Sequence, residues 1–96
     1  MEPQNPGLYY YNMFQVNQSV SLICQYDLHG EPLYSVKWYK DNIEFYRYLP
    51  RDDPPSLAFK VLGIDVVLHQ SNETTVYLTN ISLQSSGNYQ CEVMFH

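Results

Sequence analysis

Alternating apolar and polar residues mark the strands of this chain. Residues 19–26 alternate cleanly, with the apolar set Val20, Leu22, Cys24 and Tyr26 on one face. Such a period of two predicts a half-buried strand. The same pattern recurs in residues 35–40, 75–79 and 87–95, whose inward sets are Val36 and Trp38, Val76 and Leu78, and Tyr89, Cys91 and Val93. In no segment do apolar residues recur every 3.6 positions, as they would in a helix, so we expect an all-β fold.

Three further segments are weaker strand candidates. Residues 8–16 can form a first edge strand, residues 44–48 form another, and residues 61–68 form one that bends at Gly63. Residues 1–7 hold two prolines and a glycine and are expected to fray. We therefore divide the chain into an N-terminal segment, residues 1–15, partly disordered or an edge strand, and one domain, residues 16–96. A length of 96 residues allows only one small domain.

Four residues of these inward sets also specify the kind of sheet packing. Cys24 and Cys91 are placed to join two sheets, Trp38 to pack on their bridge, and Tyr89 to bond a backbone group at the corner after Gly87. This constellation predicts an immunoglobulin-like β-sandwich. A bridge across such a loop is worth about 4 kcal/mol in the chain-entropy model. A metal pair would need two more ligands, and no histidine is closely spaced to either cysteine.

Spacing indicates the type of sandwich. The stretch between Trp38 and residue 75 is long enough for an extra strand, residues 44–48, which favours the variable-type arrangement. Only five residues follow Cys91, so we expect the closing C-terminal strand to be missing. The strand of Cys91 would then present an unpaired edge.

Charge and acceptor motifs bear on partners and compartment. The net charge of −5, with no run of basic residues, argues against nucleic acid, and no apolar stretch is long enough to cross a bilayer. Three N-glycosylation patterns begin at Asn17, Asn72 and Asn80, and with a disulfide they favour an extracellular or cell-surface setting. Residues 1–14 lack the features of a secretory signal, so we expect Met1 to be an artificial or incomplete start. Any membrane attachment should then come from parts outside this chain.

The outward residues predict a protein-binding surface. Three neighbouring strands of a variable-type sheet present tyrosine and mixed charge on one side, and we assign to partner binding Lys37, Tyr39, Tyr46, Arg47, Tyr48, Gln90 and Glu92. Aromatic anchors of this kind are common at interfaces. The alternative is an ordinary solvated sheet with cross-strand pairs such as Lys37 with Glu92.

Catalysis has little support in the sequence. The adjacent acids Asp52 and Asp53 lie beside prolines in an expected loop, where a solvated turn is more common than an acid–base pair. No glycine-rich phosphate loop follows a strand. We expect no catalytic residues, no metal, no cofactor and no small-molecule substrate, and keep a hydrolase using Asp52, Asp53 or a histidine as an alternative.

Two blocks carry a resemblance more specific than the immunoglobulin signature. They are Tyr34-Ser35-Val36-Lys37-Trp38-Tyr39-Lys40 and Glu44-Phe45-Tyr46-Arg47-Tyr48, and a third likeness is Ser85-Ser86-Gly87-Asn88-Tyr89-Gln90-Cys91. Over roughly residues 16–95, the chain resembles the first variable-type domain of the Beaten path family, neuronal cell-surface and secreted immunoglobulin proteins. We expect it to depart from that family in lacking a secretory signal, a closing strand and a second domain.

The resemblance implies a role in axon guidance. Members of the Beaten path family bind Sidestep-type immunoglobulin proteins on other cells. The resemblance implies that the contact uses the sheet face with Lys37, Tyr39, Tyr46 and Glu92. We therefore expect a recognition module in neuronal adhesion. The alternatives are a homophilic or structural adhesion module, in which the exposed edge and tyrosine face pair with another copy, and a domain fragment without function.

Overall fold

The computed structural model describes residues 2–11 and 18–95, and side chains from residue 18 onward. Within these residues the chain forms two β-sheets and two short 3₁₀ turns. The strands are β1 (Glu2–Tyr11), β2 (Val20–Ile23), β3 (Leu33–Lys40), β4 (Ile43–Tyr48), β5 (Ser56–Ala58), β6 (Thr75–Leu78) and β7 (Gly87–Phe95). The turns are η1 (Leu68–Gln70) and η2 (Leu83–Ser85). The expected all-β fold is confirmed.

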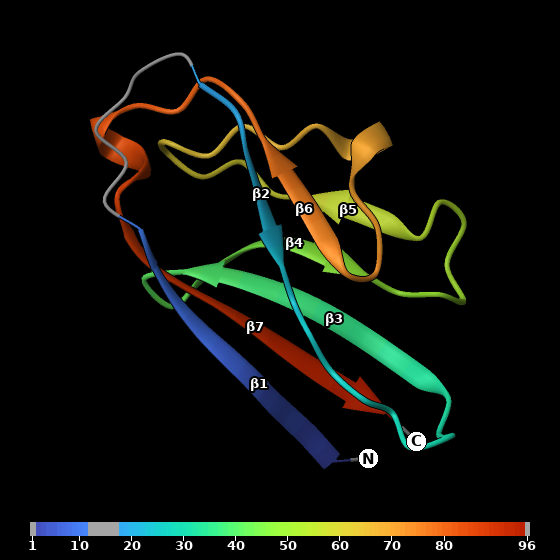
Figure 1. Cartoon of the computed structure of the whole chain (residues 1–96). Coiled ribbons are helices and arrows are strands. Elements are labelled where there is room, and N and C mark those ends of the chain that lie inside the picture. The colour runs from blue at the N-terminus through green and yellow to red at the C-terminus, as the bar shows by residue number, and fades with distance from the viewer. Residues whose placement is uncertain (1, 12–17, 96) are drawn as a thin grey trace.

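The two sheets form the layers of a sandwich. The larger has the order β1-β7-β3-β4-β5 and the smaller pairs β2 with β6, and every named pair is antiparallel. Figure 1 shows β2 and β6 lying together across the larger sheet. Strands β4 and β5 extend the larger sheet beyond β3, as in variable-type immunoglobulin domains. The short strand β5 was not expected from the sequence.

The segment expected to be one strand over residues 61–68 is irregular. Val61 and Ile64 face each other across a tight turn that contains Gly63. Residues 65–67 then run beside β6, where Thr79 N donates to Asp65 O at 2.9 Å and Val67 N to Tyr77 O at 2.9 Å. The expectation of one strand is therefore wrong, because the turn at Gly63 and η1 leave only this short piece in contact with β6.

Strand β1 occupies the edge that we expected to be unpaired. It runs antiparallel to β7, from Glu2 opposite Phe95 to Tyr11 opposite Gly87, with a register shift between Gln4 and Gly7. In a variable-type sheet this place belongs to the strand that follows the second cysteine. The expectation of an exposed β7 edge is wrong, since the N-terminal segment supplies its hydrogen-bonding partner (Figure 1).

The core lies between the sheets and is built from the predicted inward residues. The Cys24–Cys91 disulfide is confirmed, with 6.1 Å between the two Cα atoms, and Trp38 is the register neighbour of Cys91 on β3. The fully buried set includes both of these cysteines and Leu22, Val36, Trp38, Phe45, Tyr46, Val76, Leu78, Tyr89 and Val93. The disulfide therefore sits among the residues that join the two layers.

Polar contacts hold the beginning of β7 in place. The Tyr89 hydroxyl donates to the backbone oxygen of Ser85 in η2, the contact expected of a tyrosine at this corner. At the start of the strand, Asn88 N donates to Asp41 Oδ1 at 3.0 Å, and Asp41 N donates to Asn88 O at 2.8 Å. A β-carbon on Gly87 would lie 2.7 Å from Asp41 Oδ2, so only glycine fits without displacing that carboxylate.

Candidate partner-binding face

A β-bulge decides which side chains of β4 face outward. Trp38 lies opposite Tyr46, but the next pair is Tyr39 with Glu44, so Phe45 is the extra residue on β4. Simple alternation would put Phe45 and Tyr46 on opposite faces. The bulge instead lets both side chains enter the core, where the Phe45 and Tyr89 rings meet edge to face at 5.9 Å.

Tyr46 does not belong to the partner-binding face. Its side chain is fully buried, and its hydroxyl contacts Ser56 Oγ at 2.9 Å and donates to Asn72 O at 3.1 Å. Burial is also the main cause of the raised pKa of this phenol. The prediction that Tyr46 faces outward is therefore wrong, and removing its ring would damage the fold.

Tyr48 is also turned inward. It lies opposite the buried Val36 in the β3–β4 ladder and packs, partly buried, against the core. The prediction that Tyr48 belongs to the outward patch is wrong for the same reason: the bulge shifts the alternation of β4 by one residue. The two tyrosines on β4 therefore stabilise the sandwich.

The other five predicted residues come together on the outer side of the larger sheet. Lys37 lies between Arg47 on β4 and Glu92 on β7, and Tyr39 lies between Glu44 and Gln90. We call this surface the outward face and define it by Lys37, Tyr39, Glu44, Arg47, Leu57, Gln90 and Glu92. Glu44 and Leu57 were not among the residues predicted from the sequence, although Leu57 lies opposite Arg47 and is 49% exposed.

Contacts within the outward face hold its charged side chains in place. Glu44 accepts two hydrogen bonds from Arg47, from Nε at 2.8 Å and from Nη2 at 3.1 Å. The Arg47 guanidinium also lies over the Phe59 ring, 5.0 Å from its centre. A two-point pair that stacks on a ring restricts the rotamers of arginine. Phe59 thus also helps to order the outward face, and the alternation pattern could not reveal this.

Tyr39 is held beside acidic groups. Its hydroxyl donates to Glu92 Oε1 at 3.4 Å. Partial burial, followed by the nearby carboxylates of Glu92 and Glu44, raises the pKa of Tyr39. The phenol therefore stays neutral at physiological pH and offers a large, half-buried ring with a polar tip, the kind of side chain common in protein interfaces.

The glycosylation candidates lie elsewhere. Asn17 is outside the described residues, whereas Asn72 and Asn80 are both exposed and flank β6 in the smaller layer. Asp52 and Asp53, the acids of the hydrolase alternative, are exposed in the loop before β5. Among the side chains that the structure describes, residues 18–95, no three His, Cys, Asp or Glu gather as a metal site would require.

A comparison with protein families identifies the class of domain. A model of the immunoglobulin domain matches residues 3–96. The chain belongs to the immunoglobulin domain family. No curated protein and no solved structure matches it. An immunoglobulin domain with a disulfide suggests an adhesion or recognition module at the cell surface or outside the cell, and domains of this family are typically not enzymes. No helix in the described part of the chain has the length and apolar character needed to span a membrane.

Proposed function

We propose that this immunoglobulin domain is a recognition module of the Beaten path type, which binds a Sidestep-type immunoglobulin protein on another cell. The resemblance to that family in residues 34–40 and 44–48 supports the partner class. Both blocks contribute to the outward face, through Lys37 and Tyr39 on β3 and Arg47 on β4. The proposed role is heterophilic contact in neuronal adhesion and axon guidance, outside the cell.

The arrangement of the outward face is the main observation that supports this proposal. Lys37, Tyr39, Arg47, Gln90 and Glu92 come from three strands and form one continuous surface. The Arg47–Glu44 pair and the Tyr39–Glu92 contact order two of the longest side chains before any partner arrives. Side chains that are already ordered lose less entropy on binding, which favours affinity.

The charges of this face suit a partner with complementary pairs. Lys37 lies between Arg47 and Glu92, so both signs are present within one short stretch of sheet. Mixed charge gives specificity through register, because a displaced partner would bring like charges together. Tyr39 and Leu57 supply the apolar contact that charge alone does not.

The homophilic alternative relied on a free β7 edge. In the described residues that edge is paired with β1, and the tyrosines Tyr46 and Tyr48 of the supposed tyrosine face are turned inward. Both features that favoured self-association from the sequence are thus removed. We therefore propose only the heterophilic function.

The test compares alanine substitutions on the two outer surfaces of the sandwich. Replacing Tyr39 and Arg47 together by alanine should lower the affinity for a Sidestep-type ectodomain by at least about tenfold. Truncating an aromatic or arginine residue at the centre of an interface can remove about 2 kcal/mol or more of binding free energy. The matched control is Tyr77→Ala on β6, where Tyr77 lies between the buried residues Val76 and Leu78 and so faces away from the core.

Biolayer interferometry with immobilised ectodomain gives the affinities, and circular dichroism checks the fold of each variant. The proposal predicts a loss in the Tyr39→Ala, Arg47→Ala variant and little change in Tyr77→Ala. Equal affinity of the folded double variant and the parent chain would overturn it.

A further inference from the structure

We propose that Asn72 is the glycan-bearing residue of the described part of the chain, and that the fold withholds Asn80 from the same modification. Both begin an acceptor triplet, Asn72-Glu73-Thr74 and Asn80-Ile81-Ser82. The two differ in what their side-chain nitrogens contact. The inference rests on the extracellular setting in the proposed function.

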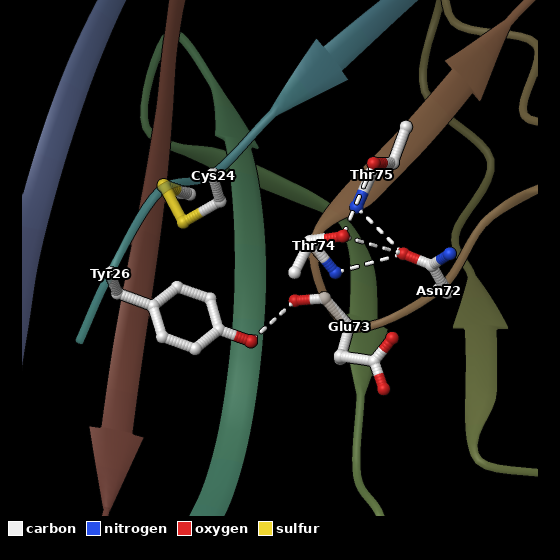
Figure 2. The surroundings of a disulfide bond; sticks show 7 residues. Cys24, Tyr26, Asn72, Glu73, Thr74 and Thr75 are labelled. Atoms are coloured by element: carbon white, nitrogen blue, oxygen red, sulfur yellow. Dashed lines mark hydrogen bonds between the residues drawn. A yellow bond between two sulfur atoms is a disulfide. The ribbon is translucent and has the colours of Figure 1, made fainter. Parts of the chain in front are cut away.

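The Asn72 side chain is held by its oxygen. Asn72 Oδ1 accepts hydrogen bonds from Thr74 N at 2.9 Å, Thr75 N at 2.9 Å and Thr74 Oγ1 at 3.1 Å. Three donors around this atom exclude the reversed amide, which would put Nδ2 against them. Figure 2 shows the nitrogen at the far end of the amide, pointing away from these contacts. Asn72 is an exposed residue, and its Nδ2 lies on the side of the amide away from the turn.

The turn that carries Asn72 is anchored from both sides. Asn72 N donates to Thr75 O at 2.8 Å, which closes the turn. The Tyr26 hydroxyl donates to Glu73 O at 2.8 Å, as Figure 2 shows, and Cys24 N donates to Thr74 O at 2.8 Å beside the disulfide. The backbone is thus satisfied by the domain itself, and a group added to Nδ2 would disturb none of these bonds.

Asn80 is in the opposite situation. Its Nδ2 donates to Asp65 Oδ2 at 2.7 Å, a charge-assisted bond to the segment beside β6. The next residue, Ile81, is only 4% exposed, and Ser82 caps η2 by accepting from Gln84 N at 3.2 Å. Once the domain folds, the acceptor nitrogen of Asn80 is therefore engaged in a hydrogen bond. Folding therefore competes with modification at Asn80 and leaves Asn72 reachable.

The chemistry required is a glycosyl transfer from a lipid-linked oligosaccharide diphosphate of the secretory pathway. Nδ2 forms a bond to the first carbon of the sugar, the bond from that carbon to the diphosphate oxygen breaks with its electron pair, and Nδ2 loses one proton. A glycan on Asn72 would leave the outward face clear. Tyr46 points inward from the larger sheet and reaches Asn72 O, so Asn72 lies on the inner side of that sheet, in the layer of β6.

The test is site-resolved occupancy in chains secreted from animal cells behind a cleavable leader. All variants carry Asn17→Gln, so that only two acceptors remain. Enzymatic glycan release in heavy-oxygen water converts each modified asparagine to labelled aspartate, which peptide mass spectrometry counts. We expect Asn72 to be occupied in most chains and Asn80 in several-fold fewer. Asp65→Ala should raise occupancy at Asn80, whereas Asp52→Ala, in the exposed loop before β5, should not.

Occupancy of Asn80 equal to or above that of Asn72 in the parent chain would overturn the inference, as would an absence of glycan at Asn72. An unchanged ratio in Asp65→Ala would show that the Asp65 contact is not what withholds Asn80. Partner affinity is measured separately on enzymatically deglycosylated chain, so failure here and failure of the proposed function are distinguishable.

Discussion

At the scale of single residues, Asp41 joins the β3–β4 turn to the start of β7. Its carboxylate accepts the Asn88 N–H at 3.0 Å and lies 3.4 Å from Lys40 Nζ. The backbone hydrogen bond from Asn88 is the main cause that lowers the pKa of Asp41, with Lys40 adding to it. A lowered pKa in the folded state means that the ionised carboxylate stabilises the fold.

We predict that Asp41→Asn lowers the free energy of unfolding by an amount that depends on pH. The stabilisation from Asp41 is fully present above the unfolded-state pKa of about 3.9 and is lost as pH falls through the lower folded-state pKa. Urea unfolding followed by Trp38 fluorescence should therefore show the variant less stable than the parent at pH 7. This difference should narrow below about pH 4.

Glu31→Gln, at an exposed loop position, is the control and should show no such narrowing. A difference between Asp41→Asn and the parent that stays constant from pH 7 into acid would contradict the role given to the ionised carboxylate.

Residue-level prediction from the sequence succeeded where period two held. The inward positions Leu22, Trp38, Val76 and Cys91 are all buried, because each lies in an uninterrupted stretch of its strand. It failed for Tyr46, since one extra residue at Phe45 reverses the faces of the remaining residues of β4. A bulge depends on how two strands meet, and residues 43–48 alone do not record that.

At the scale of elements, the turn at Gly63 is pressed against η2. Gly63 has φ of +82°, and a β-carbon there would lie 2.3 Å from the backbone oxygen of Gln84. Gly63 O also accepts a hydrogen bond from the Ser85 hydroxyl at 2.6 Å. This contact fixes the position of η2. It thereby also positions the Ser85 backbone oxygen, which accepts the hydrogen bond from the Tyr89 hydroxyl.

We predict that Gly63→Ala destabilises the domain by about 2–5 kcal/mol, because left-handed strain of about 1–2 kcal/mol adds to an overpacking cost of about 1–3 kcal/mol. Gly30→Ala is a matched control, since Gly30 has φ of +83° but no atom within 4 Å of the added carbon. Gly30→Ala should lower the free energy of unfolding by only the strain, about 1–2 kcal/mol. Equal losses in thermal or urea unfolding would contradict the packing argument.

Strand β1 shows where element prediction reached its limit. The sequence predicts a strand within residues 8–16, and the structure places β1 at Glu2–Tyr11, against β7. Pairing partners so distant along the chain are decided by which edges remain open after the sandwich forms. Local propensity cannot supply that information, and the two prolines near the start argued against a strand there.

At the scale of the whole molecule, the inner and outer surfaces of the sandwich hold different kinds of side chain. The inner surfaces hold the disulfide, Trp38 and the tyrosines of β4. The outer surface of the larger sheet carries the ordered charged and aromatic side chains, and the layer of β6 carries Asn72. The immunoglobulin class could be predicted from four residues, whereas the membership of the outward face required the register of three strands.

The most direct measurement is photo-crosslinking to a Sidestep-type ectodomain from single positions in the folded chain. A benzophenone amino acid replaces Tyr39 on the outward face or, in a second chain, Tyr77 on β6. Irradiation of each mixture followed by mass spectrometry identifies covalent adducts. We predict an adduct from position 39 and none from position 77. Adducts from position 77 alone, or from neither position while binding persists, would contradict the assignment of the outward face.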